Sequence, residues 1–240
     1  MIKRLPPAGA EPALRRLASL GPLDTWSFDA IEAALAKRQR VRRRRDILAE
    51  GKPVAGARLI VSGWAARVRI FADGRRQFLS FLLPGDLIGL CRQPEPLAVS
   101  TVTTLTEIEI CPAPQSAALE TIYATSAALD EAYLLEHITR LGRMSALERI
   151  YSLFLEFHER LSRNGLATET GFEMPLTQEM IGDALGLTAV HVNRMLQDAR
   201  RADILELNAG RVRLFNPAAL AEQIGREPVR VTSCLPVNGR

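Results

Sequence analysis

The sequence predicts an α+β fold in which an antiparallel β domain precedes a long helical segment and a helix-turn-helix. Short runs of alternating apolar and polar residues, separated by turn residues, fill residues 46–110. A helical pattern then continues from residue 116 to 161. Near the C-terminus, the stretch LTQEMIGDALGLTAVHVNRMLQ contains a helix that stops at Gly-Leu-Thr and restarts at once. These three observations set the order of the elements.

The composition is that of an ordinary soluble globular protein, with 47% hydrophobic and 24% charged residues. The 240 residues allow one large domain or two modest ones. A net charge of +4 favours a polyanionic partner. No apolar run is long enough to span a bilayer, and the N-terminal MIKRLPPAGAEP lacks the apolar core of a signal peptide. We therefore expect a cytoplasmic protein.

Two short helices are expected before the β domain. Residues 1–25 carry Pro and Gly and form a loose lead-in, with one helix around Leu14–Leu20. Trp26–Ala36 has apolar residues at helical spacing, including Phe28, Ile31 and Leu35, which predicts an amphipathic helix.

The clearest strand candidates of the β domain are ARLIVSG, WAARVRIF, RRQFLSFLL and STVTTLTEIEI. Asp73-Gly74 between two of these runs signals a hairpin with a type I′ turn, because both residues tolerate positive φ. Leu83-Pro84-Gly85-Asp86 fits a type II turn, in which Pro presets φ and Gly accepts the left-handed position. Many short strands with hairpin turns predict an antiparallel barrel, sandwich or roll.

The long helical segment has apolar residues on more than one face. One face contains Leu134, Ile138, Leu141 and Ser145, and a neighbouring face contains Tyr133, His137, Arg140 and Met144. A helix of this kind usually has two neighbours to cover. One is the β domain, and the other is either a second copy of the helix or another part of the same chain. A second helix, Ala146–Leu161, precedes a hinge at Asn164-Gly165, and a tail that begins helically follows from Pro217.

Capping and turn residues define the helix-turn-helix. Thr177 is a good N-cap for its first helix, and Gly182 lets the second helix approach closely. Gly186 supplies the left-handed residue that ends the first helix. Thr188 can cap the N-terminus of the second helix, and Val192 lies where an apolar residue must pack between the two helices.

The second helix has one apolar side and one polar side at about 100° per residue. Its buried side is predicted to contain Val192, Met195, Leu196 and Ala199. Its outward side contains Ala189, Val190, Asn193, Arg194, Gln197, Arg200 and Arg201. Small residues followed by Asn and Arg are the pattern of a helix that reads the major groove of DNA. The hairpin LELNAGRVRL would then be a wing, with Arg211 and Arg213 near the DNA backbone. The alternative to DNA binding is a structural helix pair whose polar face is simply solvated.

The segment LTQEMIGDALGLTAVHVNRMLQDARRADILEL resembles the winged helix-turn-helix of the cyclic-AMP receptor protein and fumarate–nitrate regulator (Crp/Fnr) family. The upstream stretch GWAARVRIFADGRRQFLSFLLPGDLIGL is similar to the β-roll of that family, including its Pro-Gly-Asp turn. The resemblance covers roughly residues 26–217 and implies a homodimeric transcription regulator whose roll senses a signal. It divides the chain into a lead-in (1–25), a cyclic-nucleotide-binding-like β-roll (26–125), a dimerisation helix (126–147), a winged helix-turn-helix (148–217) and a tail (218–240). The residues that we expect at DNA are Thr177, Gln178, Thr188, Ala189, Val190, His191, Asn193, Arg194, Gln197, Arg200 and Arg211.

The recognition helix departs from the family pattern. Many members carry an Arg-Glu pair and then an Arg one turn later, and the corresponding positions here are Ala189, Val190 and Arg194. Only the last Arg is kept, and Val190 can contact a thymine methyl group instead. His191 lies off the outward centre and has either a phosphate contact or a packing role.

The roll departs further, because the Glu and Arg that hold a cyclic nucleotide in the family are missing. Gly89 is followed by Leu90 and Cys91, and the counterpart of the phosphate-binding pair is near Ala98-Val99-Ser100. A cyclic phosphate would lose its charge-assisted partner, so cyclic AMP is not the expected effector, and the effector-binding residues are unknown.

Cofactor chemistry is restricted by the cysteines and histidines. Cys91, Cys111 and Cys234 are far apart and form no CxxC pair, which argues against an iron–sulfur cluster, a zinc site or a disulfide framework. Haem ligation through His137 or Cys91 stays open as the alternative to packing roles. Cys91 and Cys111 are predicted to be buried apolar thiols rather than a redox pair.

The densest charge run is KRQRVRRRR, Lys37 to Arg45, which we interpret as a solvated or subunit-facing surface. Contact with an anionic effector or with RNA polymerase, a partner expected of a transcription regulator, is the alternative.

An enzyme is not expected. His137, His158 and His191 all follow the roll, and no nucleophile elbow, phosphate loop or HExxH motif occurs. A second rival is a ligand-binding module that signals through protein contacts without binding DNA.

Overall fold

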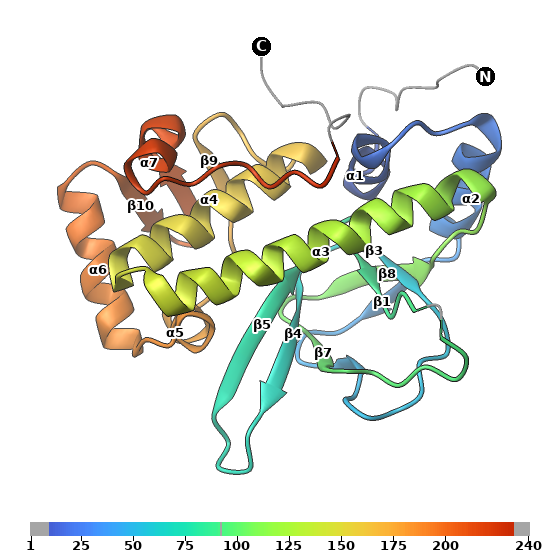
Figure 1. Cartoon of the computed structure of the whole chain (residues 1–240), viewed down its shortest axis with the longest axis horizontal. Coiled ribbons are helices and arrows are strands. Elements are labelled where there is room, and N and C mark those ends of the chain that lie inside the picture. The colour runs from blue at the N-terminus through green and yellow to red at the C-terminus, as the bar shows by residue number, and fades with distance from the viewer. Residues whose placement is uncertain (1–9, 92, 233–240) are drawn as a thin grey trace.

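The computed structural model describes residues 10–91 and 93–232, so Cys234 lies outside the described residues. The long helix α3 (Ala117–Arg143) crosses the molecule, with the β domain on one side and the helix-turn-helix at one end (Figure 1). The predicted order of roll, long helix and winged helix-turn-helix is confirmed.

The β domain is a roll of two four-stranded antiparallel sheets. One sheet has the order β1-β8-β3-β6 and the other β2-β7-β4-β5. Their bounds are β1 Gln39–Val41, β2 Asp46–Leu48, β3 Arg58–Ser62, β4 Ala65–Ile70, β5 Arg76–Leu82, β6 Leu87–Ile88, β7 Thr101–Thr104 and β8 Ile108–Pro112. The run STVTTLTEIEI therefore forms two strands in different sheets. The backbone turns between them, where Leu105 N–H donates to the Trp64 carbonyl at 2.9 Å.

The β4–β5 hairpin is present, but the predicted type I′ turn is wrong. Such a turn needs positive φ at both central residues, and among Phe71 to Arg75 only Gly74 has it, at 85°. Phe71 and Arg75 close a longer loop, with the Phe71 N–H donating to the Arg75 carbonyl at 2.9 Å. The Pro-Gly-Asp turn fits the expected geometry, since Gly85 has φ of 90° and the Asp86 N–H donates to the Leu83 carbonyl at 3.0 Å.

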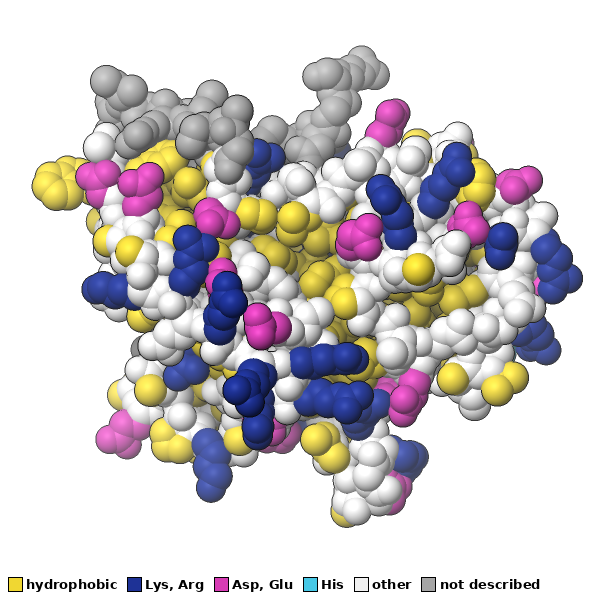
Figure 2. Space-filling model, turned by 180° about the vertical axis from the view of Figure 1, so that it is seen from behind, with side chains coloured by type: hydrophobic (Ala, Val, Ile, Leu, Met, Phe, Trp, Pro, Cys, Tyr) yellow, Lys and Arg dark blue, Asp and Glu magenta, His cyan; other side chains and the backbone are white. Residues whose placement is uncertain are grey.

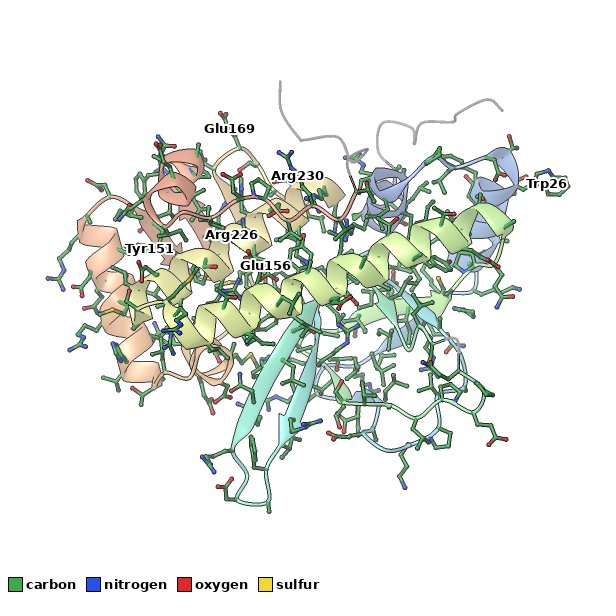
Figure 3. The ribbon with its side chains drawn as sticks, in the orientation of Figure 1. Trp26, Tyr151, Glu156, Glu169, Arg226 and Arg230 are labelled. Carbon is green, nitrogen blue, oxygen red and sulfur yellow. The ribbon has the colours of Figure 1, made fainter. Side chains whose placement is uncertain are left out.

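The described part of the lead-in, residues 10–25, is packed rather than loose. Helix α1 (Pro12–Leu20) buries Leu14 and Leu17, and helix α2 (Thr25–Leu35) buries Phe28 and Ile31. Both helices share an apolar cluster with β3 and α3. Trp26 by contrast is 81% exposed and points away from the body of the molecule (Figure 3).

The predicted dimerisation helix, residues 126–147, is interrupted near its end. Helix α3 stops at Arg143, and α4 (Ala146–Asn164) starts with Ser145 as its N-cap. Ser145 and Glu148 form a capping box, in which each side chain accepts the other's backbone N–H. Ser145 therefore lies outside α3, and residue 147 belongs to α4.

The C-terminal domain combines α4 with a helix pair and a small antiparallel sheet. Its elements are β9 Gly171–Glu173, α5 Gln178–Leu185, α6 Ala189–Arg201, β10 Leu205–Asn208, β11 Arg211–Leu214 and α7 Pro217–Gln223. The expected hairpin β10–β11 gains β9 as a third strand, paired with β11.

One apolar core crosses the boundary between the roll and this domain. The Phe157 ring on α4 packs edge-on against Trp64 and Phe81 of the roll, each at a centroid distance of 5.1 Å. The same cluster continues to Ile181 of α5 and Val192 of α6. The helix pair is therefore packed onto the roll through α4.

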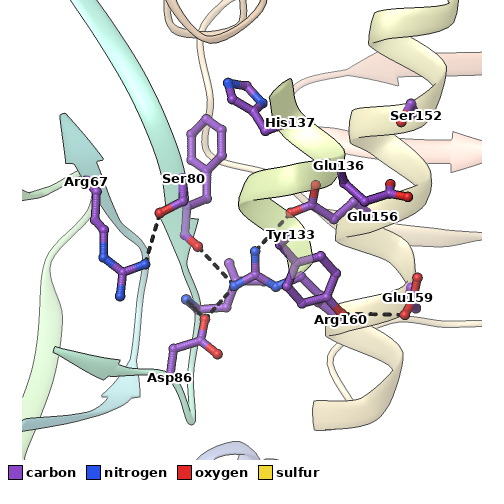
Figure 4. A network of polar contacts seen from close by, with 12 residues as sticks. Arg67, Ser80, Asp86, Tyr133, Glu136, His137, Ser152, Glu156, Glu159 and Arg160 are labelled. Carbon is purple, nitrogen blue, oxygen red and sulfur yellow. Dashed lines mark hydrogen bonds and ion pairs between the residues drawn. The ribbon is translucent and has the colours of Figure 1, made fainter. Parts of the chain in front are cut away.

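A buried polar network crosses the same boundary (Figure 4). The Arg160 guanidinium on α4 donates to the Asp86 carboxylate at 2.6 Å, to the Phe81 carbonyl at 2.9 Å and to Glu156 at 3.0 Å. Glu156 also accepts from Arg140 of α3 at 2.8 Å. Burial alone would raise the pKa of Glu156, but Arg140 and Arg160 together lower it.

Residues 224–232 follow α7 without a helix or strand, as the predicted irregular tail requires, but they pack against the rest of the molecule. Arg226 pairs with Glu159 at 2.9 Å and with Glu136 of α3 at 3.4 Å. Val229 is buried in the cluster that α1, α2 and α3 form. Figure 3 shows this segment passing along α4, from Arg226 towards Arg230. We call residues 224–232 the C-terminal strap.

The predicted hinge at Asn164-Gly165 is a helix end fixed in place. Gly165 has φ of 72° and caps α4. Asn164 is buried, and its side-chain amide donates to the Pro84 carbonyl of the roll at 2.7 Å.

Candidate nucleic-acid interface

Helix α5 is started and stopped by the residues that the sequence indicates. The Thr177 hydroxyl accepts the Met180 N–H at 3.2 Å, and Gly186 ends the helix with φ of 67°. The β4–β5 hairpin supports the helix from the side. Arg76 contacts Asp183 at 2.7 Å, and the Gln77 side chain donates to the Ala184 carbonyl at 3.0 Å.

The turn between α5 and α6 is tight because residue 182 has no side chain. A Cβ atom there would lie 2.4 Å from the Leu187 carbonyl oxygen. The Leu187 N–H donates to the Gly182 carbonyl at 3.0 Å, which closes the turn. The Thr188 hydroxyl then accepts the His191 N–H at 3.2 Å and caps α6.

The inward side of α6 is mostly as predicted. Val192, Leu196 and Ala199 are buried in the core that contains α4 and α5, whereas Met195 is only partly buried. This packing fixes the rotation of α6 about its own axis and determines which residues face outward.

The outward side presents small residues first, then amides, then arginines. Ala189, Val190, Arg194, Gln197 and Arg200 are exposed, and Val190 is 80% exposed. Asn193 is half-buried, and its amide donates to Gln178 of α5 at 3.1 Å and accepts from Gln197 at 2.9 Å. Asn193 therefore links the two helices, a contact that the sequence pattern did not indicate. His191 is also half-buried.

The arginines of this surface differ in their partners. Arg200 lies 3.3 Å from Glu206, Arg201 lies 3.1 Å from Asp198, and Arg211 lies 3.8 Å from Glu173. Across residues 10–91 and 93–232, no carboxylate lies within ion-pair distance of Arg194. The Arg194 guanidinium is thus available to a partner without breaking an existing ion pair.

The wing is a tight hairpin beside the helix pair. Ala209 and Gly210 both have positive φ, 48° and 80°, as a two-residue type I′ turn requires. Asn208 pairs with Arg211 across the hairpin, and the Arg213 guanidinium lies over the Phe215 ring at 4.6 Å. Arg211 is exposed near the hairpin tip, whereas Arg213 is partly engaged by that ring.

One face of α3 carries exposed apolar side chains. Leu135 is 59% and Ile138 is 66% exposed, while Leu134 and Leu141 are half-buried. The neighbouring face is buried against the roll and α4, and it includes Tyr133, His137 and Arg140. The exposed face is the one that the sequence assigns to a second copy of the helix.

A cavity of about 370 Å³ lies between the roll and α3. Gly89, Leu90, Cys91, Ala98, Val99 and Ser100 all line it, so the fold gathers the segments that would hold a cyclic nucleotide. Ser126, Asp130 and Leu134 of α3 form the opposite wall. The lining includes Arg67, whose guanidinium donates to Asp130 at 2.8 Å.

The two described cysteines have different environments, and the prediction that both are buried is wrong for Cys91. Cys91 is exposed in the loop after β6, whereas Cys111 is buried in β8. Burial raises the pKa of the Cys111 thiol to about 11.

Burial and the neighbouring Arg140 lower the pKa of His137, whose Nδ1 lies 3.1 Å from the Arg140 guanidinium. No group of three or more potential metal ligands occurs among the described residues.

The basic run lies along the edge strand β1 and the loop after it. Every residue from Lys37 to Arg45 except Val41 is exposed. Arg38 pairs with Glu11 at 2.9 Å, and Arg40 pairs with Glu109 at 3.1 Å. Seen from behind, Lys and Arg side chains gather over the lower half of the molecule with single acidic side chains between them (Figure 2).

No helix in the described part of the chain is both long and apolar enough to cross a membrane.

Two family models match the chain in the order that this architecture requires. A cyclic nucleotide-binding domain matches residues 38–125, and a Crp-like helix-turn-helix domain matches residues 148–223. Helices α1 and α2 and the C-terminal strap lie outside both matches.

Curated relatives cover most of the chain. The transcriptional activator protein FnrL of Cereibacter sphaeroides is 31% identical over 179 residues, which are 69% of this chain and 71% of FnrL. The transcriptional activatory protein AadR of Rhodopseudomonas palustris is 27% identical over 223 residues, 85% of this chain and 88% of AadR.

Solved structures share the fold. FixK2 from Bradyrhizobium japonicum matches with a TM-score of 0.67 and 25% identity, covering 80% of this chain and 98% of FixK2. A CRP-family transcriptional regulator from Thermus thermophilus matches with a TM-score of 0.61 and 23% identity, covering 78% and 96% of the two chains. A sensor roll, a long helix and a winged helix-turn-helix in this order, with a relative above 30% identity, show that the chain belongs to the Crp/Fnr family of DNA-binding transcriptional regulators, which are not enzymes.

Proposed function

We propose that the protein binds a two-fold symmetric DNA site as a homodimer, with α6 of each subunit in the major groove. The observation that carries this proposal is the outward face of α6, where small exposed residues precede an Arg194 without an ion-pair partner among the described residues. Small side chains allow the helix to approach the base edges, and the guanidinium can then reach them.

Arg194 is the residue to which we assign base recognition. A guanidinium can donate two hydrogen bonds to O6 and N7 of guanine, which contributes roughly 1–3 kcal/mol of discrimination against a wrong base. Val190, which is 80% exposed, is suited to contact a thymine methyl group. Asn193 is held by Gln178 and Gln197, so we assign it to positioning these amides rather than to independent base reading.

The remaining candidates surround α6 and are suited to phosphate contacts. Thr177, Gln178 and Thr188 lie at helix N-termini, where backbone N–H groups favour an anion. Arg200 and Arg211 can contact phosphates after releasing their surface carboxylates, and surface ion pairs of this kind contribute little stability. His191 is half-buried, as Gln178 and Asn193 are, and a phosphate contact is the role proposed for it.

The second subunit is expected on the exposed face of α3. Members of this family are typically dimeric, and Leu134, Ile138 and Leu141 offer apolar surface that the described residues leave wholly or partly uncovered. A two-fold axis along this face would place two α6 helices about 34 Å apart, one turn of DNA. We further propose that the DNA-bound dimer contacts RNA polymerase and acts in the cytoplasm, where its DNA target lies.

The proposal is tested by binding selection from a random DNA library with wild type, Arg194→Ala and Arg200→Ala. We expect the wild type to select inverted half-sites, and Arg194→Ala to lose preference at one position in each half-site. Arg200→Ala should weaken binding to all sequences about equally and reduce its salt dependence. If Arg194→Ala keeps the wild-type preference at every position, Arg194 does not read a base.

A further inference from the structure

The cavity between the roll and α3 is lined mainly by aliphatic side chains. The largest of these are the leucines Leu48, Leu87, Leu90, Leu97 and Leu134. Leu97 is 58% exposed and Leu90 is 36% exposed, so apolar surface continues to the mouth of the cavity. Its volume of about 370 Å³ lies within the ordinary range for small-molecule sites.

The charges of the lining do not favour an anion. Among the described residues of the lining, Arg67 is the one cation, and Asp130 and Glu131 are the carboxylates. One Arg67 amino group donates to Asp130 at 2.8 Å, and the other donates to Ser80 at 3.0 Å. With both amino groups engaged and one carboxylate in excess, the described residues of the lining offer no free cation to a phosphate or carboxylate. Removing such a charge from water is unfavourable unless it is paired.

Few polar groups remain for a ligand. Ser100 is buried in the wall from the roll, and Ser126 is buried in the wall from α3. Each hydroxyl can form one or two hydrogen bonds, which suits a ligand with a single neutral polar group. We propose that this cavity binds an uncharged, mainly apolar small molecule with one such group, and that this molecule is the effector. The inference rests on the proposed function only in naming this ligand as the effector.

The cavity is placed to couple a ligand to the dimer. Leu134 lines the cavity and also belongs to the α3 face assigned to the second subunit. Arg67 of β4 and Asp130 of α3 join the two walls directly. A ligand that separates or tightens these walls therefore acts on α3 at the level of the subunit contact.

The test uses three probes with one skeleton and different charge, namely 4-ethylbenzamide, 4-ethylbenzoate and 4-ethylbenzamidine, together with cyclic AMP. Calorimetry on the full-length protein should show that the neutral amide binds at least about tenfold more tightly than either charged analogue and than cyclic AMP. Ala127→Trp should reduce amide binding by at least about tenfold, because Ala127 is an exposed α3 residue at the rim of the cavity. Ala124→Trp is the matched control, since Ala124 is exposed one turn earlier on α3 and lines only the neighbouring cavity.

Tighter or equal binding of the benzoate, the benzamidine or cyclic AMP would overturn the proposal, as would the absence of amide binding at millimolar concentration. Equal loss of amide binding in Ala127→Trp and Ala124→Trp would also overturn it, because the ligand would then lie elsewhere. Operator binding by the unliganded protein, measured in parallel, reports on the proposed function separately. If the protein binds the operator but not the neutral amide, only the inference about the effector is contradicted. If it binds the neutral amide but not the operator, only the proposed function is contradicted.

Discussion

Replacing Gly182 with alanine would place a methyl group against the turn that precedes the recognition helix. The added Cβ would lie 2.4 Å from the Leu187 carbonyl oxygen, whereas real contacts of this kind are longer than 3.0 Å and seldom shorter than 3.4 Å. The turn must therefore move by about 0.6 to 1.0 Å. Because α6 begins only two residues after Leu187, this displacement carries into the helix that holds Arg194.

The expected effect on stability is moderate. Overpacking of this kind destabilises by about 1–3 kcal/mol, and the better helix propensity of alanine returns about 1 kcal/mol. We therefore expect a net loss of up to about 2 kcal/mol in the free energy of unfolding, measured by urea denaturation. Gly142→Ala is the matched control, because Gly142 also lies in a helix but has no atom of the described residues within 4 Å of its added Cβ.

The effect on DNA binding should be larger for specific than for non-specific DNA. A misplaced Arg194 loses a bidentate contact in each half-site, so affinity for the selected site should fall at least about tenfold. Binding to random DNA, which depends on phosphate contacts, should change much less. Fluorescence anisotropy with both DNAs measures this. If Gly182→Ala unfolds at the same urea concentration as Gly142→Ala and binds the site with wild-type affinity, the reasoning about close approach is wrong.

Three further outcomes follow from contacts described above. Ile138→Asp with Leu141→Asp should give monomers with little DNA affinity, because unpaired charge would be buried at the seam; a monomeric wild type at micromolar concentration in sedimentation would contradict this. Arg160→Met should lower the free energy of unfolding by about 3–5 kcal/mol, because buried Asp86 loses its partner at 2.6 Å and retains Arg16 only at 3.8 Å, and a loss below about 1 kcal/mol in urea denaturation would show that the network is dispensable. At pH 8 a thiol reagent should modify exposed Cys91 and spare Cys111, whose pKa of about 11 keeps it protonated until the pH approaches that value; mass spectrometry of the labelled peptides decides.

The helix-turn-helix could be predicted from the sequence because its signals are local. Thr177 and Thr188 cap helices through N–H groups three residues away, and Gly186 needs only its own φ. Val192 is buried because helical spacing alone places it on the inward side. Each of these features depends on a few consecutive residues, so no knowledge of distant contacts is required.

The buried polar network could not be predicted, because its partners are distant in sequence. Arg160 contacts Asp86, and Arg140 contacts Glu156, across element boundaries. In the sequence, Glu156 and Arg160 are four residues apart and look like an ordinary surface pair. The one available signal was Arg140 on a helical face shared with Tyr133 and His137, which indicated a buried arginine that must have a partner.

The exposure of residues in loops could not be predicted from the sequence either. The segment around Cys91 has few periodic apolar residues, so nothing in it indicates whether the thiol faces the core or the solvent. The amide contacts of Asn193 were missed for a related reason, because a helical wheel shows direction but not which neighbouring helix lies within reach.

The C-terminal strap has a consequence for how the chain folds during synthesis. Val229, close to the last described residue, completes a core whose other members include Ala13 and Leu17 near the beginning. The ribosome must therefore synthesise the roll, α3 and the winged helix-turn-helix before helix α1 can bury its apolar side fully. Contacts between such distant residues form late, since a long loop must close first. Until then α1 is an exposed amphipathic segment, open to chaperones and proteases, and a protein that lacks the C-terminal strap keeps this vulnerability after synthesis.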